Sequence, residues 1–174
     1  KPKVPYGQSR DAKSGEDRRA AFADWLTSKD NPNFAKSTVN RFWSYFFGRG
    51  IIDPVDDIRA GNPPSNPELL QALTDHFVQD NFDLRKLMRT IVTSRTYQLS
   101  ILANRWNEDD TINFSHQLPR RLSAEQMLDS IAVATGYRAS FQDLPAGTRA
   151  VQVPDGNVAG NDFLMLFGRP ADPT

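Results

Sequence analysis

Residues 34–48 have the sequence FAKSTVNRFWSYFFG. Large apolar side chains recur in this stretch at spacings of three and four residues, so they share one face of a helix. That face consists of Val39, Phe42, Trp43, Phe46 and Phe47. Gly48 follows as a C-terminal stop, because glycine adopts the left-handed conformation at a helix end without steric penalty. The stretch predicts a helix over residues 34–47 at the centre of an apolar core.

Four further segments combine the same apolar period with local start and stop signals. Their predicted N-caps are Ser14, Asn66, Asp83 and Ser123, the last in a capping box with Gln126. Pro67 occupies the first helical position after Asn66, where its missing N–H does no harm. The first of these helices is expected over residues 15–29, ended by Asp30-Asn31-Pro32, and the last is expected to stop at Gly136.

These segments predict an all-α or mainly α fold, an irregular bundle of about five helices with long loops and a poorly regular C-terminal segment. Residues 1–17 have the composition of a linker or tail, and residues 18–174 are expected to form a single helical domain. Residues 151–153 and 163–167 fit short strands or extended segments. The predicted core comprises Phe22, Trp25, Leu26, Val39, Phe42, Trp43, Phe46, Leu70, Leu73, Phe77, Leu87, Met88, Ile91, Leu128 and Ile131.

The composition argues against several classes of function. Lysine plus arginine and aspartate plus glutamate number 21 each, so no long-range field of one sign favours nucleic acid. The absence of cysteine excludes a thiolate nucleophile, a zinc–thiolate cluster and covalent attachment of a c-type haem to this chain. The apolar runs are far shorter than the roughly 20 residues that cross a bilayer, so no membrane insertion is expected.

Two long irregular stretches, residues 48–65 and 99–121, are where a functional site is expected, because loops of this length in a compact domain often carry function. The candidate ligand- or partner-binding residues lie in or beside them: Asn40, Arg41, Trp43, Arg49, Asp53, Asp56, Asp57, Arg95, Tyr97, Arg120 and Arg121. One interpretation is that the arginines pair with the aspartates and hold the irregular backbone against the helices. The other is that the guanidinium groups bind a ligand, with Trp43 or Tyr97 stacking on a sugar.

No catalytic residue is assigned. The chain lacks both a Gly-x-Ser-x-Gly elbow and a phosphate-binding loop. The three aspartates of the first loop lack the spacing of a calcium loop, and their closeness in sequence does not establish the two-carboxylate geometry of a glycosidase. His76 and His116 stand in no metal-binding motif. We therefore expect no metal site, and a binding module in preference to an enzyme.

A series of short motifs in fixed order resembles one known family. The motifs are ADWLT at 23–27, DNP at 30–32, VNRFW at 39–43, FGRG at 47–50, NPPSNPELL at 62–70, IVTSRTYQ at 91–98, PRRLSAE at 119–125 and FGRP at 167–170. This series is similar to the PSD-one domain, a family of unknown function that is abundant in planctomycetes and occurs in large proteins with cytochrome-c-like segments. Its members usually have histidine where this chain has Asn66. They also continue past the last motif into a cysteine-containing segment, so we expect the domain to be truncated at its C-terminal end.

The resemblance implies an exported, periplasmic or cell-envelope location and a haem module on a separate segment of the parent protein. It implies no catalytic residues, because the family has none established. We therefore expect a non-catalytic assembly or docking module that contacts other domains of the same parent protein, including a haem module. The alternative is a module that binds, or with missing parts cleaves, an acidic or sulfated polysaccharide.

Overall fold

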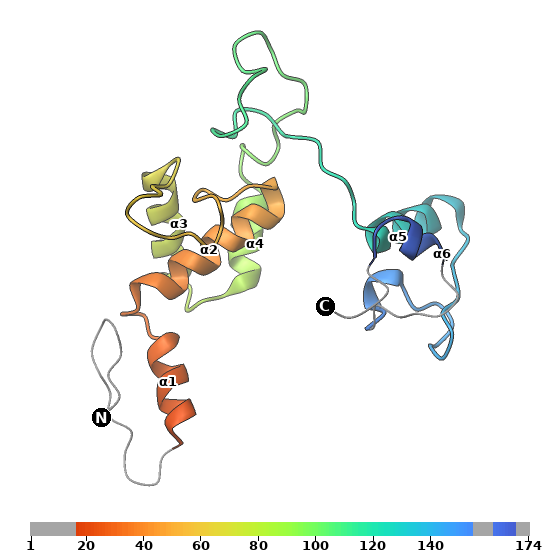
Figure 1. Cartoon of the computed structure of the whole chain (residues 1–174), viewed down its shortest axis with the longest axis horizontal. Helices are drawn as coiled ribbons and strands as arrows, with labels where there is room; N and C mark the ends of the chain where they lie inside the picture. Colours follow the sequence, from red (N-terminus) through yellow and green to blue (C-terminus); the bar gives the residue numbers. More distant parts are fainter. Residues whose placement is uncertain (1–16, 155–161, 170–174) are drawn as a thin grey trace. The chain divides into compact units, whose positions relative to one another are not determined.

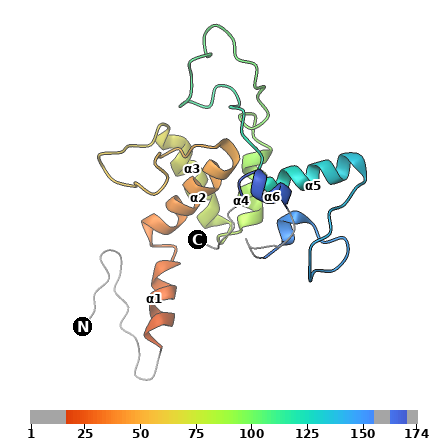
Figure 2. The ribbon, with the colours of Figure 1, turned by 45° about the vertical axis from the view of Figure 1, so that its right-hand side comes forward.

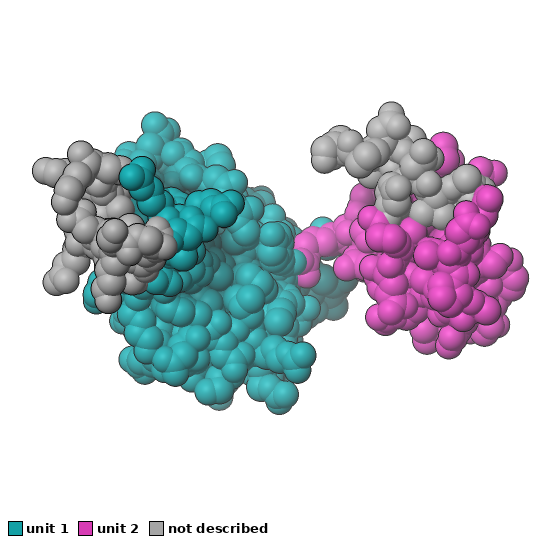
Figure 3. Space-filling model, turned by 90° about the horizontal axis from the view of Figure 1, so that it is seen from below, with its two compact units in different colours: residues 1–119 teal, residues 120–174 magenta. Residues whose placement is uncertain are grey.

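A computed structural model of the chain describes residues 17–154 and 162–169. The predicted fold class is confirmed: the described residues form six α-helices and a short 3₁₀ helix, with no strand (Figure 1). The chain is divided into two compact units, residues 1–119 and residues 120–174, which Figure 3 shows in different colours. The expectation of one helical domain over residues 18–174 stays a prediction. No helix in the described part of the chain is long and apolar enough to cross a membrane.

The first unit is built around α2 (Pro32–Phe47). This helix packs against α3 (Pro67–Gln79) and α4 (Leu84–Val92), which also contact each other (Figures 1 and 2). α1 (Arg18–Leu26) precedes them. The buried core of the unit consists of Ala35, Val39, Trp43, Phe47, Ile51, Ile52, Leu70, Leu73, Phe77, Leu87 and Ile91.

Side-chain caps start these helices. Asn66 accepts a hydrogen bond from Leu69 N and Asp83 accepts from the backbone of Arg85 and Lys86, so both predicted caps are confirmed. Asp17 caps α1, whereas the expected cap Ser14 lies outside the described residues. α1 ends at Leu26 and not at Lys29.

Asn31-Pro32 has a second role that the sequence interpretation missed. Asn31 accepts hydrogen bonds from Asn33 N and Phe34 N, and Pro32 is the first residue of α2. The dipeptide was expected only to end the preceding helix, but a proline after an asparagine cap is also a typical helix start. The central helix therefore begins two residues earlier than predicted, at 32 and not 34.

Most of the predicted core is buried or partly buried, with three exceptions. Phe22 is 54% exposed, Ile131 is 41% exposed, and Leu26 is also exposed. Phe22 and Leu26 belong to the short helix α1, whose buried residues are Ala21 and Trp25. Ile131 lies on the solvent-exposed side of the helix over residues 124–135, so apolar residues of this helix are not confined to its buried face. Ile51 and Ile52, each only 1% exposed, were missed because they lie in a loop without helical period.

The second unit contains α5 (Ala124–Thr135), the 3₁₀ helix η1 (Ala150–Gln152) and α6 (Asp162–Leu166). The Ser123–Gln126 capping box starts α5 and Gly136, with φ +74°, ends it, as predicted. Both η1 and α6 pack on α5. The possibility of short strands at 151–153 and 163–167 is wrong, because these segments are largely helical. A small core fills the unit: Ala124, Phe141, Ala150, Val153 and Leu164.

Candidate functional site

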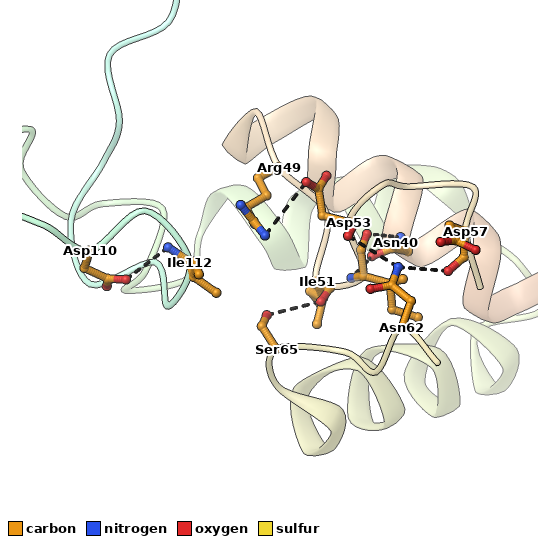
Figure 4. A network of polar contacts seen from close by, with 10 residues as sticks. Asn40, Arg49, Ile51, Asp53, Asp57, Asn62, Ser65, Asp110 and Ile112 are labelled. Atoms are coloured by element: carbon orange, nitrogen blue, oxygen red, sulfur yellow. Dashed lines mark hydrogen bonds and ion pairs between the residues drawn. The ribbon is translucent and has the colours of Figure 1, made fainter. Parts of the chain in front are cut away.

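The loop between α2 and α3 is organised by one buried amide. Asn40, 0% exposed on α2, donates from Nδ2 to the carbonyl oxygens of Ile52 at 2.9 Å and Val55 at 3.1 Å. Its Oδ1 accepts from Ile52 N at 2.8 Å. Figure 4 shows this side chain reaching from the helix into the loop. Asn40 is therefore a structural residue that pairs with backbone, and none of its hydrogen-bonding groups faces solvent.

The returning part of the loop is held in the same manner. Asn62 Nδ2 donates to the carbonyl oxygens of Asp53 at 3.3 Å and Asp57 at 3.0 Å (Figure 4). Ser65 donates to Ile51 O from both its backbone N, at 2.8 Å, and its hydroxyl, at 3.1 Å. Side chains thus satisfy backbone carbonyl groups that no regular secondary structure pairs, and these hydrogen bonds hold the irregular segment in place.

Gly50 permits the close approach of helix and loop. A Cβ atom at this position would lie 2.2 Å from Ile52 O and 3.0 Å from Asn40 Oδ1. The 2.2 Å separation from Ile52 O is too short for any real Cβ contact. The backbone here can therefore lie this close to Ile52 O and Asn40 only because residue 50 has no side chain.

The charged candidates of this loop are paired. Arg41 forms an ion pair with Asp56, Arg49 Nη2 lies 3.8 Å from Asp53 Oδ2, and Asp57 is bound by Arg59 at 2.9 Å. Arg59 was not among the predicted site residues. No group of three metal-ligating side chains is found among the residues described. These contacts support the structural interpretation of Arg41 and Arg49 over ligand binding.

The aromatic candidates pack against the core of the first unit. Trp43 is 2% exposed and stacks on Phe47 with ring centroids 4.1 Å apart. Tyr97 is half-buried and packs edge-on against Phe46 and Phe47 at 5.9 and 5.8 Å. Trp43 is therefore too deeply buried for a sugar to stack on its ring.

The remaining arginine candidates are exposed. Arg95 follows α4 in the first unit, and no ion pair of its side chain is found among the described residues. Arg120 and Arg121 begin the second unit. The structure thus pairs Arg41 of α2 and Arg49 with aspartates of the loop that follows α2, and leaves the other three arginines outside this group.

The second long loop is anchored on the aromatic face of α2. Phe114 packs edge-on against both Trp43 and Phe47 at 5.3 Å. Gln117 Nε2 donates to the carbonyl oxygens of Thr96 at 3.1 Å and Tyr97 at 3.0 Å, and its backbone N donates to Ser100 O. The two ends of the loop are therefore held together beside the core.

Asp110 shapes the far part of this loop. Its carboxylate accepts from the backbone N of Ile112 at 3.0 Å (Figure 4), of Asn113 at 2.8 Å and of Ser115 at 3.3 Å. A hydrogen bond from the Ser115 side chain, followed by those from the backbone N–H of Asn113 and Ile112, holds the pKa of the Asp110 carboxyl well below its usual range. The ionised carboxylate thus stabilises the turn.

Large apolar side chains stand out from the loop held in this way. We call them the apolar loop surface: Leu99, Ile101, Leu102, Trp106 and Ile112. Leu102 and Trp106 are each 81% exposed, and the Arg105 guanidinium lies 4.4 Å from the Trp106 ring centroid. In Figures 1 and 2 this loop, drawn in green, extends beyond the helices of its own unit. Sequence reasoning missed these residues, although a tryptophan and an Ile-Leu pair in a polar stretch without helical period were the available signal.

A small cavity lies beside the anchor of the loop. It has a volume of about 150 Å³ and is lined by Trp43, Phe114, Leu69 and the polar residues Ser65, Asn66, Thr96 and Asn113. The indole Nε1 of Trp43 is buried without a hydrogen-bond partner in the described structure. No charged side chain lines this cavity.

The comparisons with known proteins give one match. The sequence model of the family described as PSD1, protein of unknown function (DUF1553), matches residues 18–155. The matched region covers α1 to α5 and η1. Neither the curated proteins nor the solved structures contain a match to the chain.

Proposed function

The chain belongs to the PSD1 family of proteins of unknown function, and from this premise we propose that it is a non-catalytic docking module whose contact is the apolar loop surface. The observation that carries the proposal is the exposure of Leu102 and Trp106 at 81% each on a loop that is otherwise held firmly. Exposed tryptophan is enriched among the residues that dominate protein–protein binding energy.

The anchoring of the loop supports this role. Phe114, Gln117 and Asp110 fix both the base and the turn of the loop, so little conformational freedom is lost when a partner binds. The apolar side chains then supply burial, at roughly 25 cal/mol per Å² removed from water. A loop with exposed apolar residues and no ordering contacts would lose much of this gain to entropy.

The partner that we propose is another segment of a larger exported protein, including its haem module. The similarity of the ordered sequence motifs to cytochrome-linked bacterial proteins supports this partner and an envelope location. Binding of an acidic or sulfated polysaccharide has less support, because Arg41 and Arg49 are paired with carboxylates and Trp43 is buried.

The test is a binding titration of the chain against separately produced segments of its parent protein and products of neighbouring genes. We expect binding at micromolar concentration to one of them. The double change Leu102→Ser and Trp106→Ala should weaken it at least about tenfold, because it removes both main apolar contacts. Circular dichroism of the variant should be unchanged, since both side chains are exposed.

The matched control is Val133→Ser, which removes a similarly exposed apolar side chain from α5. It should leave the affinity within about twofold of the unmodified chain. The absence of binding at micromolar concentration, or equal loss in the double variant and the control, would contradict the proposal.

A further inference from the structure

The second unit contains a hollow of about 370 Å³ between α5 and the segment of residues 138–150. This volume lies within the range of about 300–1,000 Å³ that is usual for small-molecule sites. All of its lining residues belong to this one unit. None of the candidate residues of the first unit contributes to it.

The wall of this hollow is apolar on one side. Phe141 and Ala150 are buried core residues, and Leu128 and Ala132 of α5 are half-buried beside them. A ligand that fills the hollow would therefore need an apolar body to replace the water in contact with these groups.

The charged side chains of the lining are Arg138, Arg149 and Asp129. Asp129 is engaged within the unit, because its carboxylate accepts from Ala150 N at 2.8 Å and Val151 N at 3.3 Å. Arg138 and Arg149 are exposed, and neither has an ion pair among the described residues. The lining thus carries one net positive charge, and both guanidinium groups keep donors available.

The backbone at Gly147, which lines the hollow, leaves room for the Arg138 guanidinium. Its Nη1 lies 3.6 Å from the position that a Cβ on Gly147 would occupy, and Gly147 has φ +85°. The guanidinium therefore lies beside a part of the backbone that has no side chain. The C-terminal end of α5 also faces this region through Gly136, but its partial charge of roughly −0.5 is smaller in size than the one net positive charge of the lining.

We propose that this hollow binds a small carboxylate with an apolar body. The carboxylate is held by Arg138 and Arg149, whose planar donor pairs match its two oxygens. The apolar body lies against Phe141, Leu128 and Ala132. This site shares no residue with the apolar loop surface.

The experiment is calorimetric titration of the whole chain with benzoate and octanoate as probes, and with benzamide as the uncharged analogue of benzoate. We expect at least one carboxylate to bind at least about tenfold more tightly than benzamide, with binding that weakens on adding salt. The better-fitting apolar body is identified by the comparison of benzoate with octanoate.

Four variants locate the site. Arg138→Ala and Arg149→Ala should each weaken binding by about three- to tenfold. Ala132→Phe should block the apolar part while leaving the charges in place. Arg121→Ala, which removes an exposed arginine outside the hollow, should have no effect. Equal binding of benzoate and benzamide, equal loss in Arg121→Ala and Arg138→Ala, or no binding up to about 10 mM would overturn the proposal.

Discussion

At the scale of single residues, the side-chain amide of Asn40 provides hydrogen-bond partners for the backbone of an irregular loop, as a neighbouring strand does in a sheet. Both of its polar ends are used: Nδ2 donates to the carbonyl oxygens of Ile52 and Val55, and Oδ1 accepts from Ile52 N. A buried amide is stable only when such partners are present, because an unpaired buried donor or acceptor costs about 1–3 kcal/mol. Gly50 is the condition for this arrangement, since its bare backbone lets Asn40 and Ile52 meet.

The first prediction concerns this glycine. Gly50→Ala should lower the free energy of unfolding by about 2–3 kcal/mol, because the new Cβ forces Ile52 O and Asn40 apart and strains the packing. Gly61→Ala in the same loop is the control, because a Cβ there meets nothing within 4 Å. It should change the stability by less than about 0.5 kcal/mol. Urea unfolding followed by tryptophan fluorescence measures both, and equal effects would mean that Gly50 is not a point of close approach.

At the scale of elements, the helix starts could be predicted because their causes are local. Asn66, Asp83 and Ser123 each cap a helix within three residues of their own position, so the sequence contains the whole interaction. The role of Asn40 could not be predicted, because its partners lie 12 and 15 residues away in a loop without periodicity. Ile51 and Ile52 are buried in the same loop, where no periodic pattern marks them as core residues. The pairing of Arg41 with Asp56 was one of two open interpretations, since sequence proximity does not give geometry.

The second prediction concerns the loop turn around Asp110. Asp110→Asn should accelerate hydrogen exchange of the Ile112, Asn113 and Ser115 amides by about five- to tenfold, because charge-assisted hydrogen bonds become neutral ones. Asp109→Asn, a change at the neighbouring exposed carboxylate, should leave these rates unchanged. If both variants behave alike, the turn is not held by Asp110.

The same carboxylate gives a pH dependence of known sign. The pKa of Asp110 is lower in the folded chain than its ordinary value of 3.8, so its contribution to stability is complete above that value. It is lost as pH falls through the depressed pKa of the folded state. Amide protection in the turn, corrected for intrinsic exchange, should therefore be constant from neutral pH to about 5 and fall only in stronger acid. A loss of protection centred near pH 6 would contradict this assignment.

At the scale of the whole molecule, the two units have unequal cores. The first buries three aromatic rings, two from α2 and one from α3, together with aliphatic residues of three helices and a loop. The second buries Phe141, Val153 and Leu164 with two alanines. Because burial stabilises in proportion to apolar area, the second unit should be the less stable of the two.

A prediction about unfolding follows from this difference in core size. All three tryptophans, Trp25, Trp43 and Trp106, lie in the first unit, so their fluorescence reports on that unit alone. Circular dichroism also detects α5. During denaturation the helical signal should begin to fall at a lower urea concentration than the fluorescence changes. Coincident transitions would show that the units unfold together.

The short sequence separations around Asn40 have a consequence for the speed of folding. The hydrogen bonds that join α2 to the loop, and the two ends of the loop to each other, span 12 to 15 residues. Closing chain segments of this length costs little entropy, so these contacts can form early in folding. The helix–loop–helix of residues 32–79 is therefore expected to be the nucleus from which the first unit folds. Substitutions at Asn40 and Gly50 should then slow folding itself, rather than only hasten unfolding.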